Sequence, residues 1–161
     1  MKSHKDQDAE GIKLIASNKR AGFDYFIIEK LETGIVLQGS ELKPCREGRV
    51  NLKDGFAVVE KGELWLHEVH IGANPFANRL DHSALRKRKL LAHARQINKL
   101  AMKIQTGGNT IVPLRMYFKN GRVKVEIALV KGKRQYDKRD TIAKKDLKRD
   151  MEQEMSGKKY G

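Results

Sequence analysis

The stretch VPLRMYFKNGRVKVEIALV, residues 112–130, has the pattern of two strands joined by a tight turn. Apolar residues alternate on both sides of Asn120-Gly121, the pair best suited to a type I′ turn. The alternating residues are Val112, Leu114, Met116 and Phe118 before the turn, and Val123, Val125, Ile127 and Leu129 after it. Pro113 suits an edge or the start of pairing. We therefore expect an antiparallel hairpin here.

The rest of the chain continues this period of two. Further strands are expected in pairs around two turns: Tyr25–Leu31 and Ile35–Leu37 around Glu32-Thr33-Gly34, and Phe56–Glu60 and Glu63–Ile71 around Lys61-Gly62. One helix is expected to start at Asp81 or Ser83 and stop at Gly107-Gly108, and a shorter one covers Ser40–Arg46. About six antiparallel strands in so short a chain favour closure, which removes exposed sheet edges. The expected fold is mainly β (α+β), an OB-like antiparallel β-barrel with flanking helices and a flexible basic C-terminal tail.

The length of 161 residues fits one domain with tails. From Lys131 onward, cations and acids alternate with few large apolar residues, so this segment cannot bury a core. We expect a flexible arm over residues 1–16, the barrel over 17–131 and a tail over 132–161. The tail is expected to be disordered when free and helical on a partner, because Ala143, Leu147, Met151 and Met155 are four apart.

The composition indicates a polyanionic partner. The chain has 34 Lys and Arg against 20 Asp and Glu, a net charge of +14, which suits nucleic acid or an acidic membrane surface. The sequence has neither an apolar run long enough for a membrane span nor a signal peptide. A single cysteine, Cys45, suits a reducing compartment. We therefore expect a cytoplasmic protein with no membrane association.

The placement of the charge favours RNA. No Asp or Glu occurs from His82 to Val125, although this segment holds the run Arg86-Lys87-Arg88-Lys89. At the expected start of a helix, these cations oppose the macrodipole, so phosphate contact explains them better than local stability does. The alternative is a solvated charged turn. His93, a lone histidine, could equally be a surface or packing residue.

A second basic run begins just past the last expected strand. Gly132 to Arg139 places Tyr136 between cations, as base stacking beside a phosphate backbone requires. The alternative is a flexible polar tail without a ligand.

Signals for catalysis or metal binding are weak. His67 and His70 lie three apart on an expected strand, which puts them on opposite faces. Cys45 has no motif partner, and the acidic residues are scattered. We expect no catalytic residue, metal site or cofactor.

Several ordered segments carry a specific resemblance. They are NKRA (18–21), ETGIVLQGSELK (32–43), NLKD (51–54), GELWL (62–66), HI (70–71), RKLL (88–91), VPL (112–114) and GKRQYDKR (132–139). In these segments the chain resembles the small protein B family. The resemblance implies an OB-like barrel without enzymatic activity that binds the tRNA-like domain of transfer-messenger RNA. It also implies delivery of that RNA to stalled ribosomes in trans-translation, by a monomer with no small-molecule substrate.

The resemblance and the charge pattern together give the expected site. The expected RNA-binding residues are Lys19, Arg20, Glu32, Arg86, Lys87, Arg88, Lys89, Leu91, His93, Gly132, Lys133 and Arg134. Tyr136, Asp137, Lys138 and Arg139 are expected to contact ribosomal RNA in the decoding centre at the A site. The tail as a whole is expected to act in the decoding centre and the mRNA channel.

Two other functions are considered. A general OB-type RNA-binding module would explain the charge and the barrel but would not need the run from Tyr136 to Arg139. A nucleic-acid enzyme would need clustered carboxylates or a metal site.

Overall fold

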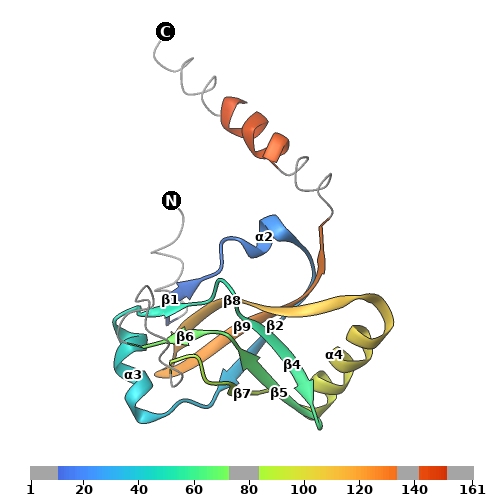
Figure 1. Ribbon diagram of the computed structural model, residues 1–161. Coiled ribbons are helices and arrows are strands. Elements are labelled where there is room, and N and C mark those ends of the chain that lie inside the picture. Colours follow the sequence, from blue (N-terminus) through green and yellow to red (C-terminus); the bar gives the residue numbers. More distant parts are fainter. Residues whose placement is uncertain (1–10, 73–83, 134–141, 152–161) are drawn as a thin grey trace.

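The computed structural model describes residues 11–72, 84–133 and 142–151 (Figure 1). The strands are β1 (Ile12–Ser17), β2 (Tyr25–Ile35), β3 (Val50–Asn51), β4 (Phe56–Glu60), β5 (Glu63–His67), β6 (His70–Ile71), β7 (Arg88–Leu91), β8 (Asn109–Lys119) and β9 (Arg122–Gly132). The helices are α2 (Ala21–Asp24), α3 (Gly39–Arg46) and α4 (Ala94–Gly107). Residues 142–151 are also helical, and all of them are exposed.

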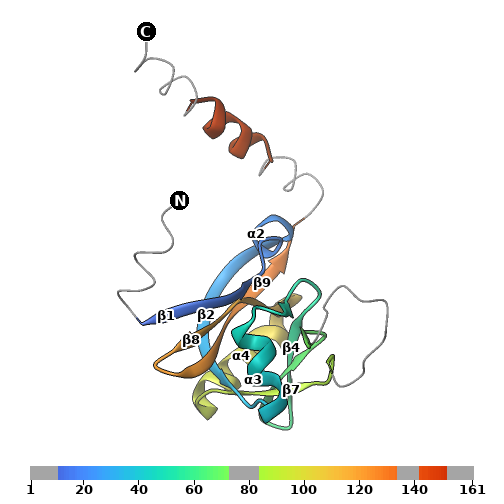
Figure 2. The same ribbon diagram turned by 90° about the vertical axis from the view of Figure 1, so that its left-hand side faces the viewer.

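The strand pairings of the described residues close into a ring. The order in the main sheet is β1-β8-β4-β5-β7-β2-β9, and β8 also pairs with β9. The ring therefore runs through β8, β4, β5, β7, β2 and β9. β1 pairs with residues 115–119 of β8, on the same edge of β8 that pairs with β4 at Ile111. Figure 2 shows β2, β8 and β9 curving together, and α3 and α4 lie on opposite flanks in Figure 1. The expected mainly β, OB-like fold is confirmed.

Two tight turns have the predicted geometry. Asn120 and Gly121 both have positive φ, 51° and 76°, and so do Lys61 and Gly62, at 50° and 75°. Positive φ at both central residues is what a type I′ turn requires. The two predicted hairpins, β8–β9 and β4–β5, are confirmed.

The first strand of the β8–β9 hairpin does not present the single alternating face that the sequence predicts. The register shifts between Pro113 and Arg115, a β-bulge that reverses the side-chain directions. Ile111 and Met116 consequently lie in the main core. The residues that form a second cluster outside the barrel are Ala21, Val112, Leu114, Ala128 and Val130. The expected inward residues of β9, Val123, Val125, Ile127 and Leu129, all lie in the main core.

The predicted turn at Glu32-Thr33-Gly34 is wrong, because β2 continues unbroken from Tyr25 to Ile35. Its register against β9 runs from Tyr25 opposite Gly132 to Gly34 opposite Lys124, with a bulge between Ile27 and Glu29. Thr33 is buried, and its hydroxyl donates to the carbonyl oxygen of Val125 at 2.9 Å. Long pairing with β9 therefore overrides the local turn signal.

Three other predicted boundaries also differ. The helix α4 begins at Ala94, because residues 88–91 form β7 between β5 and β2; the expected caps Asp81 and Ser83 lie outside the described residues. The expected strand Glu63–Ile71 is divided into β5 and β6 by Glu68, whose φ is 59°. Residues 12–16, expected in a flexible arm, belong to β1, which pairs with β8.

A buried ion pair ties α3 to β7. Arg88 is 0% exposed and Glu41 is 5% exposed. The Nε of Arg88 donates to Glu41 at 2.6 Å, and its two terminal nitrogens donate to the carbonyl oxygens of Val69 at 2.8 Å and Ala84 at 3.0 Å. Arg86 also donates to Glu41. The three guanidinium nitrogens of Arg88 and both carboxylate oxygens of Glu41 have partners, as buried charges require. The buried Nε of Arg86 has none among the described residues.

The pKa of Glu41 gives the pH range in which this cluster stabilises the fold. Burial raises this pKa, but hydrogen bonds from the Gln38 amide and from Arg88 and Arg86 lower it more, so it lies below the ordinary 4.5. A lowered folded-state pKa stabilises the protein above the unfolded value. The contribution is therefore full at neutral pH and is lost as the pH falls through the folded pKa.

We predict that Glu41→Gln destabilises the protein by about 3 to 5 kcal/mol at pH 7, because it leaves Arg88 charged and buried without its anion. Denaturant unfolding followed by circular dichroism measures this difference, which should shrink toward acidic pH. Glu60→Gln is the control. Glu60 lies 3.8 Å from the Nζ of Lys87 and both side chains are half exposed, so this pair should contribute less than about 1 kcal/mol to stability. Equal effects of the two substitutions would contradict this account of the cluster.

Candidate nucleic-acid interface

An open hollow of about 350 Å³ lies where β2, β7 and β9 meet the start of α4. It is lined by Glu32, Gly34, Leu91, Ala92, His93, Gln96 and Lys124. Gly34 is opposite Leu91 in the pairing of β2 with β7, and a Cβ on Gly34 would lie 3.2 Å from the Cβ of Leu91. A side chain at residue 34 would therefore be tight against Leu91. The pairing of these two strands brings residues 32 and 91 into one hollow.

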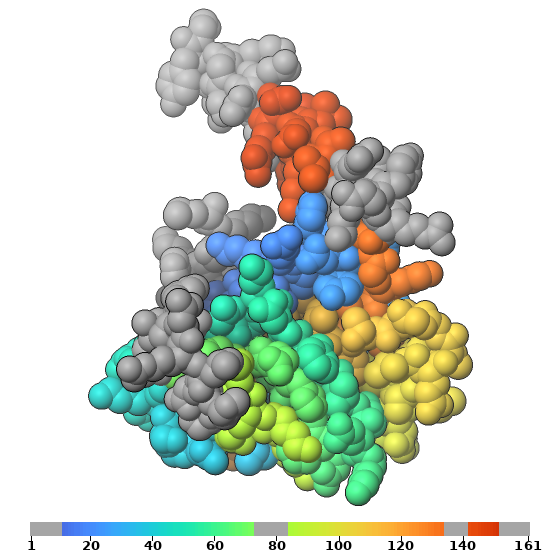
Figure 3. Space-filling view, viewed as in Figure 1, coloured from blue at the N-terminus to red at the C-terminus, as the bar shows by residue number. Residues whose placement is uncertain are grey.

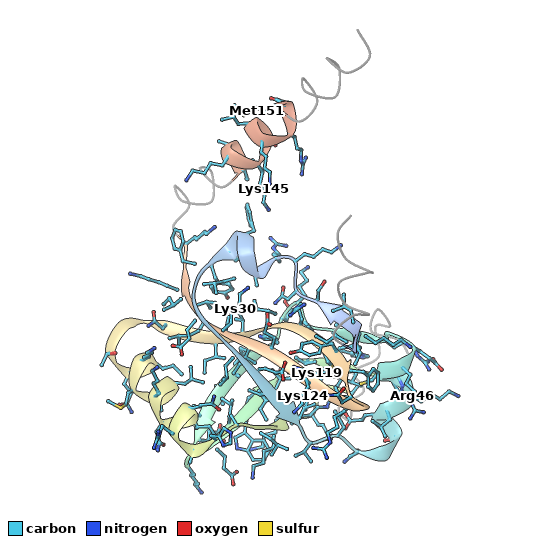
Figure 4. The ribbon with its side chains drawn as sticks, turned by 180° about the vertical axis from the view of Figure 1, so that it is seen from behind. Lys30, Arg46, Lys119, Lys124, Lys145 and Met151 are labelled. Carbon is cyan, nitrogen blue, oxygen red and sulfur yellow. The ribbon has the colours of Figure 1, made fainter. Side chains whose placement is uncertain are left out.

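Glu32 is the acidic group of this hollow. The hydroxyl of Tyr117 donates to its carboxylate, and the Nζ of Lys119 lies 3.4 Å from one oxygen and 3.5 Å from the other. The hydrogen bond from Tyr117 lowers the pKa of Glu32 more than burial raises it, and Lys119 and Lys124 lower it further. Glu32 is thus an ionised hydrogen-bond acceptor at neutral pH. Figure 4 shows Lys119 and Lys124 beside each other near β2.

The N-terminus of α4 also opens into the hollow. His93 is the N-cap residue, and its amide donates to the side chain of Gln96 at 3.2 Å. Helix N-termini carry partial positive charge and free amide groups, which favour anions. Leu91 is 50% exposed beside them. The hollow therefore combines an acceptor, an apolar surface and a positively polarised helix end.

A second hollow, of about 630 Å³, lies at the opposite end of β2. Its lining includes Arg20, Lys53, Gly132 and Lys133. The amide of Lys133 donates to the carbonyl oxygen of Asp24 at 2.9 Å, and its Nζ lies 5.0 Å from the centre of the Phe26 ring. Figure 3 shows α2 in blue and the end of β9 in orange adjoining in this region. The start of the tail is therefore anchored to the barrel here.

The two hollows are separated by the length of β2. Gly34 lines the first, Tyr25 lines the second, and these residues lie nine positions apart in one strand. At about 3.3 Å per residue, the ends are roughly 30 Å apart along the strand.

Comparison with known proteins places the chain in a family. The family model described as SmpB protein matches residues 15–157. The chain belongs to the SmpB family. An SsrA-binding protein of Sulfurihydrogenibium sp. (strain YO3AOP1) is 53% identical over 146 residues, 91% of this chain and 96% of the relative. An SsrA-binding protein of Geobacillus thermodenitrificans (strain NG80-2) is 54% identical over 140 residues, 87% of this chain and 90% of the relative.

The same family appears among solved structures. A chain from a structure described as "tmRNA-SmpB: a journey to the center of the bacterial ribosome" superposes with a TM-score of 0.61 at 38% identity. The match covers 79% of this chain and 93% of the other.

The residues that the SmpB resemblance assigns to RNA divide between the two hollows. Glu32, Leu91 and His93, distant in sequence, line the first. Arg20, Gly132 and Lys133 line the second, with Lys19 exposed next to Arg20. Five expected residues lie outside the described part of the chain: Arg134, Tyr136, Asp137, Lys138 and Arg139.

The run from Arg86 to Lys89 does not form the single phosphate-binding unit that the sequence predicted. Arg88 cannot contact phosphate in this fold, because it is buried and its donors are used by Glu41 and backbone carbonyls. Arg86 is also held by Glu41. Lys87 lies 4.7 Å from the centre of the Trp65 ring, and Lys89 pairs with Glu63 at 3.3 Å.

The segment of residues 82–125 contains no acids in sequence, but the folded surface around it does. Acids from other segments pair with its cations: Glu29 with Lys99 and Lys103, Glu32 with Lys119, and Glu126 with Arg115. Lys124 makes no ion pair within the described residues, and it lines the first hollow. The sequence prediction missed Lys124, and it also missed Tyr117, whose outward direction depends on the bulge in β8.

The described ranges give little support for a nucleophilic cysteine, a metal site or a membrane span. Cys45 is buried, and burial raises the pKa of its thiol to about 11, which keeps it protonated and unreactive at neutral pH. No group of three potential metal ligands occurs in residues 11–72, 84–133 and 142–151. Within the same ranges, no helix is long and apolar enough to cross a bilayer.

We predict that Lys119→Gln raises the pKa of Glu32, because it removes a cation 3.4 Å from the carboxylate. Titration of the Glu32 side-chain carboxyl by ¹³C NMR measures the change. Lys30→Gln, on the same strand as Glu32, removes the same charge and should leave this pKa in place. A shift of equal size in both variants would indicate an effect of net charge alone.

Proposed function

We propose that this protein binds the tRNA-like domain of transfer-messenger RNA through the first hollow and delivers it to stalled ribosomes in trans-translation. The observation that carries the proposal is the meeting of Glu32, Leu91 and His93 in that hollow. Membership of the SmpB family supports the same partner, since its relatives are SsrA-binding proteins.

The groups in the first hollow fit a folded, partly single-stranded RNA element. A carboxylate repels phosphate, so Glu32 accepts hydrogen bonds from base or ribose donors. The exposed side chain of Leu91 offers an apolar surface to a base or a sugar. Lys124 and the N-terminus of α4 attract the phosphates alongside. This combination reads RNA shape and base edges in addition to charge.

The opposite end of the barrel supports the ribosomal part of the proposal. The second hollow anchors Lys133, where the described part of the barrel ends, through the carbonyl oxygen of Asp24. We propose that Tyr136, Asp137, Lys138 and Arg139 contact ribosomal RNA at the decoding centre. The exposed helix at residues 142–151, with Ala143, Leu147 and Met151 along one side, would pack against a ribosomal surface.

The protein then acts in the cytoplasm as a monomeric RNA-binding factor. It would supply binding energy and geometry without a catalytic step. A barrel with two separated ends suits this function better than a general RNA-binding module with one face.

We predict that Glu32→Ala weakens binding to the tRNA-like domain by about tenfold or more, because a hydrogen bond to a charged group is lost. Binding to a random RNA of equal length should stay the same or tighten slightly, since the substitution removes a negative charge and frees Lys119. Fluorescence anisotropy with the two labelled RNAs measures both affinities.

The control for this experiment is Glu60→Ala, which removes an equal charge from a residue that does not line the hollow. Within the described residues, the ion-pair partner of Glu60 is the exposed Lys87. It should leave the preference for the tRNA-like RNA unchanged. Equal weakening of both RNAs by Glu32→Ala would argue against recognition through this carboxylate.

A further inference from the structure

We propose that Tyr117 is a positioning residue that fixes the Glu32 carboxylate for RNA recognition. It would act through Glu32, without itself contacting the RNA. The inference rests on the proposed function, since it specifies how the acceptor in the first hollow is presented.

The phenol of Tyr117 reaches across a whole strand. Tyr117 lies on β8, Glu32 lies on β2, and β9 pairs with both of these strands. In this register Tyr117 is opposite Lys124, which is opposite Gly34, two residues along β2 from Glu32. The hydroxyl donates to Oε2 of Glu32, so the ring lies diagonally across the outer face of β9. A hydrogen bond across three strands holds the carboxylate relative to the barrel itself.

The ring is held on the outside of the barrel by charged neighbours. Arg115 lies over it, with its guanidinium carbon 5.3 Å from the ring centre, and Arg115 pairs with Glu126 at 3.0 Å. As a result, Tyr117 is only 1% exposed although it points away from the main core. Burial raises the pKa of Tyr117, and its hydrogen bond to Glu32 raises it further, so the phenol stays protonated and can donate. The hydroxyl is therefore a fixed donor in the physiological pH range.

The two oxygens of Glu32 consequently have different roles. Oε2 accepts from Tyr117 and faces Lys119 at 3.4 Å, while Oε1 has, among the described residues, the single contact with Lys119 at 3.5 Å. The second contact is long for a hydrogen bond. Oε1 is thus the acceptor left for the RNA, and the chemistry it fits is a single donor, such as an exocyclic amine of a base or a ribose 2′-hydroxyl. Holding the carboxylate in one rotamer reduces the entropy lost when that donor binds.

Tyr117→Phe tests the proposal because it removes the hydroxyl and keeps the buried ring. We expect binding to the tRNA-like domain to weaken by roughly fivefold to tenfold, while binding to a random RNA of equal length changes by less than about twofold. Thr106→Val gives the control, because it removes an exposed hydroxyl that lines neither hollow and donates to the carbonyl oxygen of Met102 within α4. It should leave the affinity for the tRNA-like domain unchanged.

A double-mutant cycle distinguishes positioning from a structural effect. In a Glu32→Ala background, Tyr117→Phe should cause no further loss, because its target is absent. The Glu32 carboxyl pKa, followed by ¹³C NMR, should rise in the Tyr117→Phe variant. The positioning role would be overturned if Tyr117→Phe weakened binding as much in the Glu32→Ala background as in the wild-type protein. Equal losses of affinity for both RNAs would also overturn it.

The outcomes also separate this inference from the proposed function. If the wild-type protein prefers the tRNA-like domain and Tyr117→Phe binds it equally well, the positioning role alone is wrong. If the wild-type protein binds both RNAs equally, the proposed function is wrong.

Discussion

Pairing of β9 with both β8 and β2 is the constraint on which the rest of the structure depends. This three-stranded unit supplies both ends of the barrel, since β2 carries Glu32 near one end and Tyr25 at the other. It also gives Tyr117 and Glu32 a common outer face across β9. The remaining strands close the ring, and the buried Arg88–Glu41 pair attaches α3 to it. This unit therefore sets the separation between the first hollow, the proposed RNA-binding end, and the start of the tail.

The Lys and Arg side chains of this molecule differ in whether they are buried, paired with acids or placed in a hollow. Arg88 is buried in an ion pair that stabilises the fold, and several exposed lysines form ion pairs with acids from distant segments. The net charge of +14 still attracts RNA from a distance, but it does not identify the contact residues. Lys124 and the N-terminus of α4 are distinguished from the other positive groups by their place in a hollow beside an acceptor. We propose that long-range attraction of RNA and its specific recognition are carried by different parts of this surface.

Patterns set by neighbouring residues could be predicted from the sequence, whereas features set by pairing partners could not. The Asn120-Gly121 turn and the inward face of β9 follow from local rules. The family resemblance predicted Glu32, Leu91 and His93 as site residues, and these three line one hollow. The bulge after Pro113 and the unbroken course of β2 depend on the register with β9. Burial of Arg88 depends on Glu41, 47 residues away in the chain. Because these partners are remote, no local pattern indicated them.

The most direct test of the two-ended account removes the tail and leaves the barrel intact. A chain ending at Lys133 keeps all of β9 and the contact of Lys133 with Asp24, so it should fold and bind the tRNA-like domain with nearly full affinity. It should fail to support tagging of a stalled nascent chain in a reconstituted translation system, because nothing in the barrel replaces the contacts of the tail. Tagging at the normal rate by this truncated protein, with its RNA binding retained, would contradict the account.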